Sequence, residues 1–566
     1  MRAMATAPNA PPRQIPFLVF SAANEAASLL FELIQAKASP PCLISNENTI
    51  GYHLSLPLSP DDADADADED GAESGSSGFM RWIIGAGPPP SVVEKRLKHA
   101  HPHVLLCTPG DTPASNAVRS HVKDLHAIVK FHPSSGVLML QTFCDRPIVY
   151  ERGDVHDQDL TLGLDEWGNG KTCVLRRERN YLRFGPYRFL LEFVAQTRGN
   201  YDMFTAHLNE HINGEFHGLN PSRLFNFIPM PSPYHKTLWN VWLHHRIPTT
   251  GITAGVNIHT GRPVAVKKVW NKDVARTRRR VIDRLQMALQ YRDSRDGGIL
   301  GIVDIWCDHQ TSPPCLFNTH DKEMVDECRH TFYSMPLASY NFLDLPWTKV
   351  ANNIRLAYLH QTLLGLANLH RQGLVHGNIR PGSLLVLGDA KHAPRADAEA
   401  LETKRAAICF SMSRVEKKMF DATRICIPPE VWQNKRATAR LDEAKGDVWA
   451  LAASWLYAFI LPPSTFKVAT RQDHLQMQAQ LDRQVRQNSS LEPFVALLRR
   501  MLAWEPQHRP SAAEALESDA WQSVWADKQR TEERKKRKRT AQMRPDGVRR
   551  VRVLSPNIED VRVIES

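Results

Sequence analysis

The chain has 566 residues, of which 42% are hydrophobic and 23% charged. This balance is ordinary for globular protein and excludes a wholly disordered, collagenous or membrane-embedded chain. Nine cysteines are too sparse for a disulfide scaffold, and no pair has the CxxC spacing of common zinc sites. We therefore expect reduced thiols and no metal site.

The net charge of +10 is concentrated near one end. Residues 528–553 contain 12 Lys/Arg and three acids, whereas residues 61–73 contain eight carboxylates. The first 14 residues hold no apolar run, so we expect no signal peptide. The longest apolar stretch, Val448 to Leu461, has 14 residues, too few to span a bilayer. We expect an intracellular protein without a membrane partner.

The first part of the chain has the pattern of a β-sandwich. Residues 1–14 are rich in Pro and Ala and are predicted to be disordered. Residues 15–197 are predicted to form an all-β sandwich, with 59–78 as an acidic loop. Its expected strands are short apolar runs bounded by turn residues, at 17–20, 81–84, 104–107, 127–131, 137–141, 147–150, 172–176 and 189–194.

The second part of the chain, which follows a predicted linker at 198–235, has a different pattern of apolar residues. Residues 236–525 begin with two strand-like segments and a basic amphipathic helix at Asp273–Tyr291. Beyond 345, leucines recur at helical spacing, so a small β-rich lobe precedes a larger helical lobe. Residues 526–566 are predicted to be a basic, largely disordered tail.

Five motifs occur in order in this second part. They are VAVK ending at Lys267, LHRQGLVHGNIRPGSLL at 369–385, PPE at 428–430, GDVWAL at 446–451 and WEPQHRPSA at 504–512. Their order and spacing resemble a eukaryotic protein kinase domain over 236–525. The resemblance implies an α+β bilobal fold, ATP as a ligand and serine/threonine kinase ancestry.

The structural residues of that family are retained. Glu430 and Arg509 match the family's buried ion pair, and Asp447 matches the aspartate that ties the catalytic loop to a buried helix. His376 keeps its place in the catalytic loop. The resemblance therefore implies an intact large lobe.

The catalytic residues are not retained. Asn378 stands at the position of the base aspartate, and an amide cannot accept a proton near neutral pH. Arg380 replaces the lysine that contacts the transferring phosphate. Ser383 and Cys409 stand at the two metal-binding positions, where Mg²⁺ prefers hard, charged oxygens. The sequence thus indicates a pseudokinase and argues against Mg²⁺.

The nucleotide-binding segments are altered as well. The glycine-rich loop is about three residues short by comparison with the family pattern, and Gly251 and Gly255 are its candidate phosphate contacts. Lys267 has two interpretations: it contacts a nucleotide phosphate, or it pairs with Asp283, because no glutamate lies between Lys268 and Lys322. Arg380 is the remaining candidate nucleotide contact.

Residues 15–197 resemble a forkhead-associated (FHA) domain, a sandwich that reads phosphothreonine peptides. The resemblance rests on IIG at 83–85, LHAIV at 125–129 and YLRFGPYRF at 181–189. The family's phosphate-binding arginine is Ala86 here, so Lys123 and Arg146 are candidates for a different phosphate site or are solvated surface charges. His126 is predicted to be structural.

The basic tail, with RKKRKR at 534–539, is typical of a nuclear-import sequence, whereas a nucleic-acid arm is less favoured. The whole chain resembles FHA-linked checkpoint-type serine/threonine kinases of filamentous fungi. We expect a nuclear scaffold or regulator that binds phosphorylated or kinase-pathway proteins and the import machinery. Two alternatives are an active, atypical serine/threonine kinase and a chromatin-associated adaptor that binds through its tail.

Overall fold

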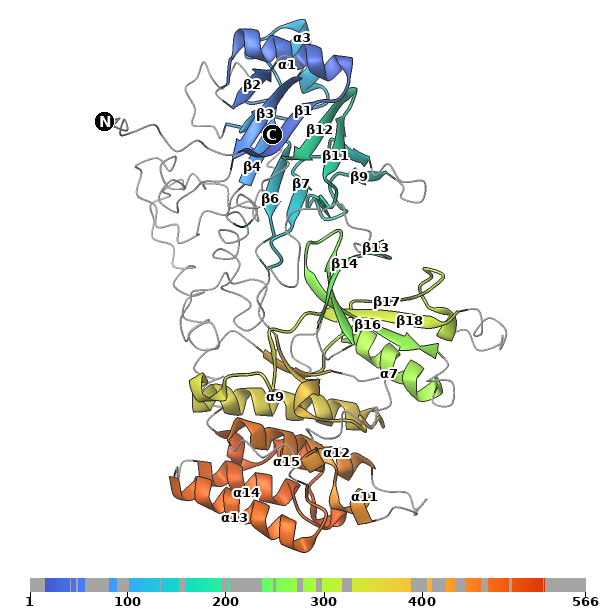
Figure 1. Cartoon of the computed structure of the whole chain (residues 1–566), viewed down its shortest axis with the longest axis vertical. Coiled ribbons are helices and arrows are strands. Elements are labelled where there is room, and N and C mark those ends of the chain that lie inside the picture. The colour runs from blue at the N-terminus through green and yellow to red at the C-terminus, as the bar shows by residue number, and fades with distance from the viewer. Residues whose placement is uncertain are drawn as a thin grey trace, which may run out of the picture.

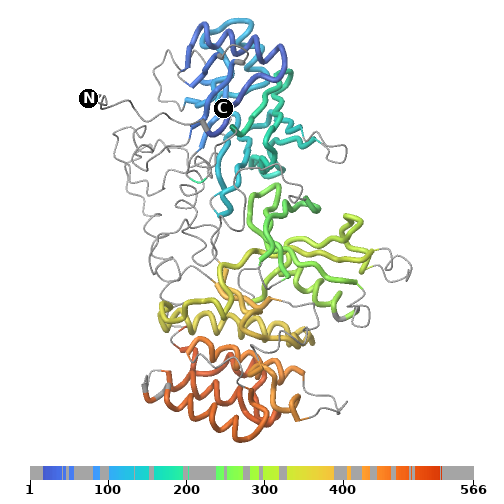
Figure 2. The backbone as a smooth tube through the Cα atoms, in the orientation of Figure 1, coloured from blue at the N-terminus to red at the C-terminus, as the bar shows by residue number. Residues whose placement is uncertain are grey.

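The computed structural model describes residues 16–194, 202 and 237–524. The gaps within these ranges are 41, 47–48, 56–80, 89–100, 133, 152–158, 248–250, 272–277, 292–297, 318–327, 388–404, 410–423, 434–442, 460–466, 488–490 and 523. The predicted N-terminal segment, acidic loop and basic tail, and the linker apart from residue 202, lie outside the described residues. The chain runs from a sandwich through a small lobe to a helical lobe (Figure 2).

The N-terminal region contains two β-sheets (Figure 1). One has seven strands in the order β2-β3-β1-β12-β11-β8-β9, and the other has five in the order β10-β7-β6-β4-β5. Apolar side chains alternate with exposed ones, as in β11, where Leu182 and Phe184 are buried and Arg183 is exposed. The strands are β1 Pro16–Ala22, β2 Leu43–Asn46, β3 Thr49–Ser55, β4 Arg81–Gly85, β5 Val104–Leu105, β6 Ala127–Phe131, β7 Leu138–Thr142, β8 Ile148–Glu151, β9 Leu160–Leu162, β10 Thr172–Val174, β11 Arg179–Phe184 and β12 Tyr187–Phe193.

This region is not all-β, and that part of the sequence prediction was wrong. Among its described residues are the helices α1 Glu25–Lys37 and α3 Pro113–Arg119. The side chain of Asn24 caps α1 by accepting the N–H of Ala27 at 3.1 Å. Four apolar residues at helical spacing bury one face of α1: Ala27, Leu30, Phe31 and Ile34. Packing of this face on the seven-stranded sheet explains why the segment folds as a helix.

In the part of the chain that the structure describes, the small lobe consists of a six-stranded sheet and the helix α7 Arg278–Gln290. The strand order is β13-β14-β15-β16-β18-β17, which places β16 at the centre. Lys267 of β16 lies opposite Tyr333 of β18 and Ile252 of β15. The strands are β13 Thr237–Leu238, β14 Val241–Ile247, β15 Ile252–Asn257, β16 Pro263–Trp270, β17 Asp304–Cys307 and β18 His330–Pro336.

The large lobe is helical, apart from a three-stranded sheet in the order β19-β20-β21. Nine consecutive residues of α12, 447–455, are buried, as expected for a helix at the centre of the lobe. None of the described helices is long and apolar enough to cross a membrane. The elements are β19 Tyr340–Asn341, α9 Asn352–Arg371, β20 Leu384–Leu387, β21 Arg405–Ile408, α11 Pro429–Gln433, α12 Glu443–Trp455, α13 Arg471–Gln487, α14 Glu492–Met501 and α15 Ala512–Leu516. Short 3₁₀ turns are η3 Cys315–Phe317, η4 Trp347–Lys349, η5 Pro381–Ser383, η7 Arg424–Cys426, η8 Leu456–Ala458, η10 Pro506–His508 and η11 Asp519–Trp521.

The turn between β15 and β16 contacts the sandwich. The N–H of Val174 donates to the carbonyl of Ile258 at 2.8 Å, and the Ser135 hydroxyl donates to the carbonyl of Gly261 at 2.7 Å. Gly261 has φ +70°, and a Cβ there would lie 2.8 Å from His132 Cδ2. Because glycine alone fits this conformation and this space, the turn is matched closely to the sandwich surface.

Candidate functional site

The catalytic-loop segment lies between α9 and β20, and Asp447 holds its backbone. The N–H groups of His376 and Gly377 donate to the Asp447 carboxylate at 2.7 and 2.8 Å. His370 Nε2 lies 3.2 Å from the same carboxylate. Since Asp447 is buried at the start of α12, this arrangement joins the loop to the core of the large lobe.

Asn378 occupies the position of the family's base. Its backbone N–H donates to His376 Nδ1 at 3.2 Å. Its side-chain Nδ2 is buried and has no hydrogen-bond partner among the described residues. An amide nitrogen is a donor only, so this group can hold an acceptor such as a hydroxyl oxygen but cannot remove a proton from it.

Ser383 uses its hydroxyl within its own turn. The Oγ donates to the carbonyl of Arg380 at 2.8 Å and accepts the N–H of Arg380 at 3.0 Å. These two bonds close η5 and leave the oxygen little capacity for a metal ion. The position that supplies an amide oxygen in the family here stabilises a local turn.

Cys409, at the second metal position, lies beside another sulfur atom. Its Sγ lies 3.4 Å from the Met335 sulfur. Burial raises the pKa of its thiol, although the charges of Lys267 and Arg380 act in the opposite direction. A neutral thiol and a serine already engaged in a turn do not provide the hard oxygen ligands of an octahedral Mg²⁺ site. The residues present therefore do not fit Mg²⁺.

Two cations lie beside this altered site. Desolvation lowers the pKa of Lys267, Cys409 raises it and Arg380 lowers it further. Helix α7 carries Asp283, the expected substitute for the family's helix glutamate. The next residue on this helix, Arg284, donates to the carbonyl of Val375 at 2.6 Å. Lys267 and Arg380 are thus the described cations that could hold a phosphate.

The two candidate glycines differ in their surroundings. Strands β14 and β15 pair up to Ile247 and Ile252, so that only residues 248–251 connect them. Gly251 has φ +67° and open space around its Cα, as expected for a turn. Gly255 lies within β15, where a Cβ would come within 2.6 Å of Val241 Cγ1. Gly255 is therefore explained by close strand packing rather than by phosphate binding.

In the sandwich, His126 is a buried structural residue. Its Nδ1 accepts the N–H of Lys123 at 3.1 Å, and its ring packs against Phe184 with centroids 5.0 Å apart. Burial, together with the charge of Arg146, lowers the pKa of His126 to about 4. His126 is therefore neutral near pH 7.

The two candidate phosphate-binding cations of the sandwich lie around this histidine but already have partners. Lys123 Nζ lies 3.9 Å from Asp145 in an exposed ion pair, and Arg146 donates to the carbonyl of Arg119. The guanidinium of Arg119 itself donates to the carbonyls of Gly87, at 2.8 Å, and Ala86, at 3.3 Å. The sequence analysis did not single out Arg119, because α3, which ends at this residue, was not predicted.

The ion pair of the large lobe is present in the structure. Arg509 donates through both terminal nitrogens to Glu430, at 2.7 Å each. Its guanidinium carbon lies 4.9 Å above the ring of Trp449. The Arg509 side chain has 0% exposure and that of Glu430 has 12%. This pair belongs to the framework of the lobe.

Comparison with known families agrees with this geometry. Residues 250–521 match the family model of the protein kinase domain. The chain is therefore a kinase-fold protein, and its strand-rich N-terminal region is compatible with a β-sandwich. Kinase domains in general bind ATP and Mg²⁺. No curated protein matches the chain significantly.

Proposed function

We propose that this kinase-fold protein is a pseudokinase that serves as a scaffold or regulator in nuclear phosphorylation signalling. The observation that carries the proposal is the state of the three altered side chains. Asn378 offers an amide where a base is needed, Ser383 is engaged in its own turn, and the Cys409 sulfur lies against Met335.

The size of the expected loss follows from the chemistry. Phosphoryl transfer depends almost entirely on positioning and on charge stabilisation by metal ions and cations. If each lost group were worth only about 100-fold, each would raise the barrier by about 2.7 kcal/mol. Such effects are not strictly additive. Loss of the base together with both metal positions nevertheless removes most of the machinery.

A phosphotransfer assay tests this proposal. Purified full-length protein should incorporate no labelled phosphate from ATP with Mg²⁺ or Mn²⁺ above the level of its Lys267→Ala variant. Incorporation that depends on Lys267 would favour the atypical kinase instead. A thermal-shift titration with ATP, with and without Mg²⁺, is the companion measurement. Stabilisation by ATP alone is the result expected of a nucleotide-binding pseudokinase, because Lys267 and Arg380 are retained and the metal ligands are not.

For the sandwich, we propose FHA-like binding of a phosphorylated partner. The support is a group of three cations near one end of a sheet, Arg119, Lys123 and Arg146. The charges of Lys123 and Arg146 lower the pKa of His126. Anisotropy titrations with matched phosphothreonine and threonine peptides should show a preference for the phosphorylated set. Lys123→Ala should weaken it, whereas Arg179→Ala, at an exposed ion pair on β11, should not. Equal binding of both peptide sets would refute this proposal.

Nuclear location is proposed from the sequence of the tail. Deleting 528–566 should move a tagged protein from nucleus to cytoplasm, because this segment carries the import-type basic cluster. Nuclear accumulation of the truncated protein would contradict the import role. Retention on chromatin that is lost with the tail would favour the adaptor.

A further inference from the structure

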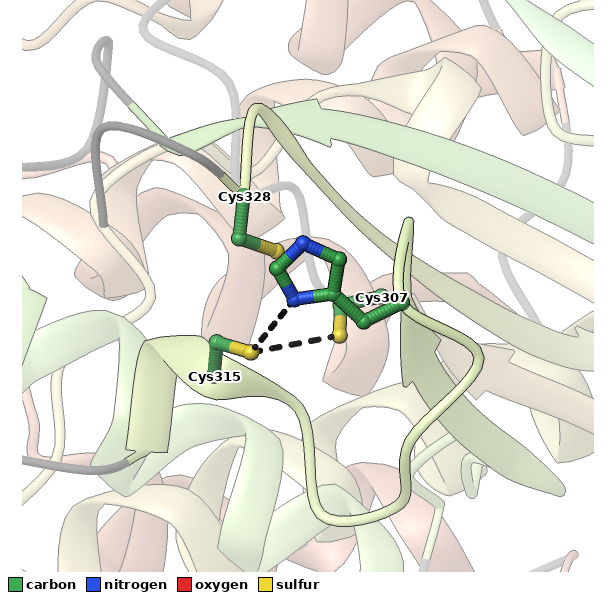
Figure 3. A group of neighbouring side chains, drawn as sticks. Cys307, Cys315 and Cys328 are labelled. Carbon is green, nitrogen blue, oxygen red and sulfur yellow. Dashed lines mark hydrogen bonds between the residues drawn. The ribbon is translucent and has the colours of Figure 1, made fainter. Parts of the chain in front are cut away.

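A cluster of cysteines and a histidine lies in the small lobe, outside the cleft. Cys307 ends β17, Cys315 begins η3 and Cys328 lies two residues before β18. His309 is in the loop that follows β17. Figure 3 shows the three labelled sulfur atoms pointing toward one another. Residues far apart in the loop thus converge on one point.

The distances match the vertices of a small tetrahedron. One ligand atom from each of the four residues lies within 4.8 Å of the others. Cys307 Sγ is 3.6 Å from Cys315 Sγ, which is 3.3 Å from His309 Nδ1. Around tetrahedral Zn²⁺, with Zn–S of about 2.3 Å and Zn–N of about 2.0 Å, these separations would be about 3.8 and 3.5 Å. These two observed separations therefore lie within about 0.3 Å of the values expected around a bound ion.

The cysteines are not paired with one another. All three are free thiols, and a disulfide would require sulfur atoms about 2.05 Å apart. Their side chains are buried and form a small cluster separate from the main core. Burial of this kind is expected for metal ligands.

Neighbouring polar groups hold these ligands in place. The buried amide of Asn271 donates to the Cys328 carbonyl at 2.6 Å and approaches its Sγ at 3.7 Å. The Asn271 oxygen in turn accepts from the Thr331 hydroxyl at 2.8 Å. The Thr311 hydroxyl lies 3.1 Å from Cys307 Sγ. Such donors next to sulfur stabilise thiolates and orient metal ligands.

The four residues lie along the connection between β17 and β18, where a bound ion would stabilise the loop. Cys307 and Thr331 are direct partners in the β17–β18 pair, but residues 308–330 separate them along the chain. Hairpin connections usually have about two to five residues. An ion held at both ends of this connection and at η3 would close it and fix it beside the sheet.

We propose that Cys307, His309, Cys315 and Cys328 bind one structural Zn²⁺ ion. Three sulfur ligands and one imidazole suit zinc and exclude the hard ions Mg²⁺ and Ca²⁺. The three thiols lose their protons on binding, and the histidine binds in its neutral form. Four protein ligands leave no open position, so the ion is structural. The sequence expectation of no metal site missed this group because its spacing, C-x-H-x₅-C-x₁₂-C, lacks a CxxC pair.

The first test is the zinc content of the full-length protein, purified under reducing conditions without chelators. Inductively coupled plasma mass spectrometry should find about one zinc per chain. Cys315→Ser should lose most of it. Cys426→Ser, a matched change at a buried thiol of the large lobe, should retain it. Equal zinc in both variants, or none in folded wild-type protein, would overturn the proposal, as would a disulfide between Cys307 and Cys315.

A second pair of variants separates loss of metal from loss of folding. His309 is exposed, so neither His309→Ala nor His309→Cys should unfold the protein. His309→Ala should release zinc at a lower chelator concentration than wild type. His309→Cys should keep it, because it restores a fourth ligand. A zinc-specific chelator should lower the melting temperature of wild type but not of Cys315→Ser. Identical zinc retention by His309→Ala and wild type would remove His309 from the site and refute the four-ligand proposal.

Discussion

Removal of the Arg509 side chain is the sharpest test of the large lobe. In the structure the guanidinium makes two bonds to Glu430 and also donates to the carbonyls of Ala503, Lys445 and Trp504, at 2.8, 3.2 and 3.1 Å. Arg509→Ala would leave the Glu430 carboxylate and these carbonyls without their donor. Truncating one partner of a buried pair costs about 3–5 kcal/mol.

This cost is large compared with the stability of a domain, about 5–15 kcal/mol. At about 2–4 °C per kcal/mol, the melting temperature should fall by about 6–20 °C. Arg471→Ala is the matched control, since Arg471 pairs with Glu505 at 2.9 Å but has 63% exposure. Exposed pairs are worth about 0–1 kcal/mol, so the control should melt within a few degrees of wild type.

Differential scanning fluorimetry and soluble yield of the three full-length proteins measure this contrast. An Arg509→Ala protein that melts within about 2 °C of wild type would mean that the pair contributes little. The reasoning that assigns the retained motifs to a structural role would then be refuted.

Two further predictions concern the sandwich and its contact with the small lobe. His126 has a pKa of about 4 in the folded chain and near 6.5 in the unfolded chain. Between these two pH values the unfolded chain therefore binds more protons at this residue than the folded chain does. The contribution of His126 to the free energy of unfolding should therefore fall by roughly 3 kcal/mol as pH drops from 6.5 to 4. His126→Gln should flatten this slope in melting curves, and equal slopes would contradict the assignment. Gly261→Ala should weaken the contact between this turn and the sandwich, because its Cβ would clash with His132. Limited proteolysis between the sandwich and the small lobe should therefore be faster. Gly251→Ala, also at positive φ but in open space, is the control, and equal cleavage rates would show that the contact is unimportant.

Much of the fold could be read from local sequence. The apolar runs at 127–131 and 189–194 became β6 and β12, since a short apolar run bounded by turn residues is a property of consecutive residues. Helix α1 was missed, although its cap at Asn24 and its apolar spacing from Ala27 to Ile34 were present in the sequence. The assignment of Asn378 to the base position and of Cys409 to a metal position likewise followed from motif order alone.

What the sequence by itself determined was thus the order of elements and which side chains stand at each motif position, because both depend on neighbouring residues. The tertiary structure alone decided which distant groups meet. Strand register brought Cys307 and Cys328 together across the undescribed 318–327, and packing placed Arg284 against the catalytic loop. Contacts of this kind depend on long-range packing, for which a single chain carries no local pattern.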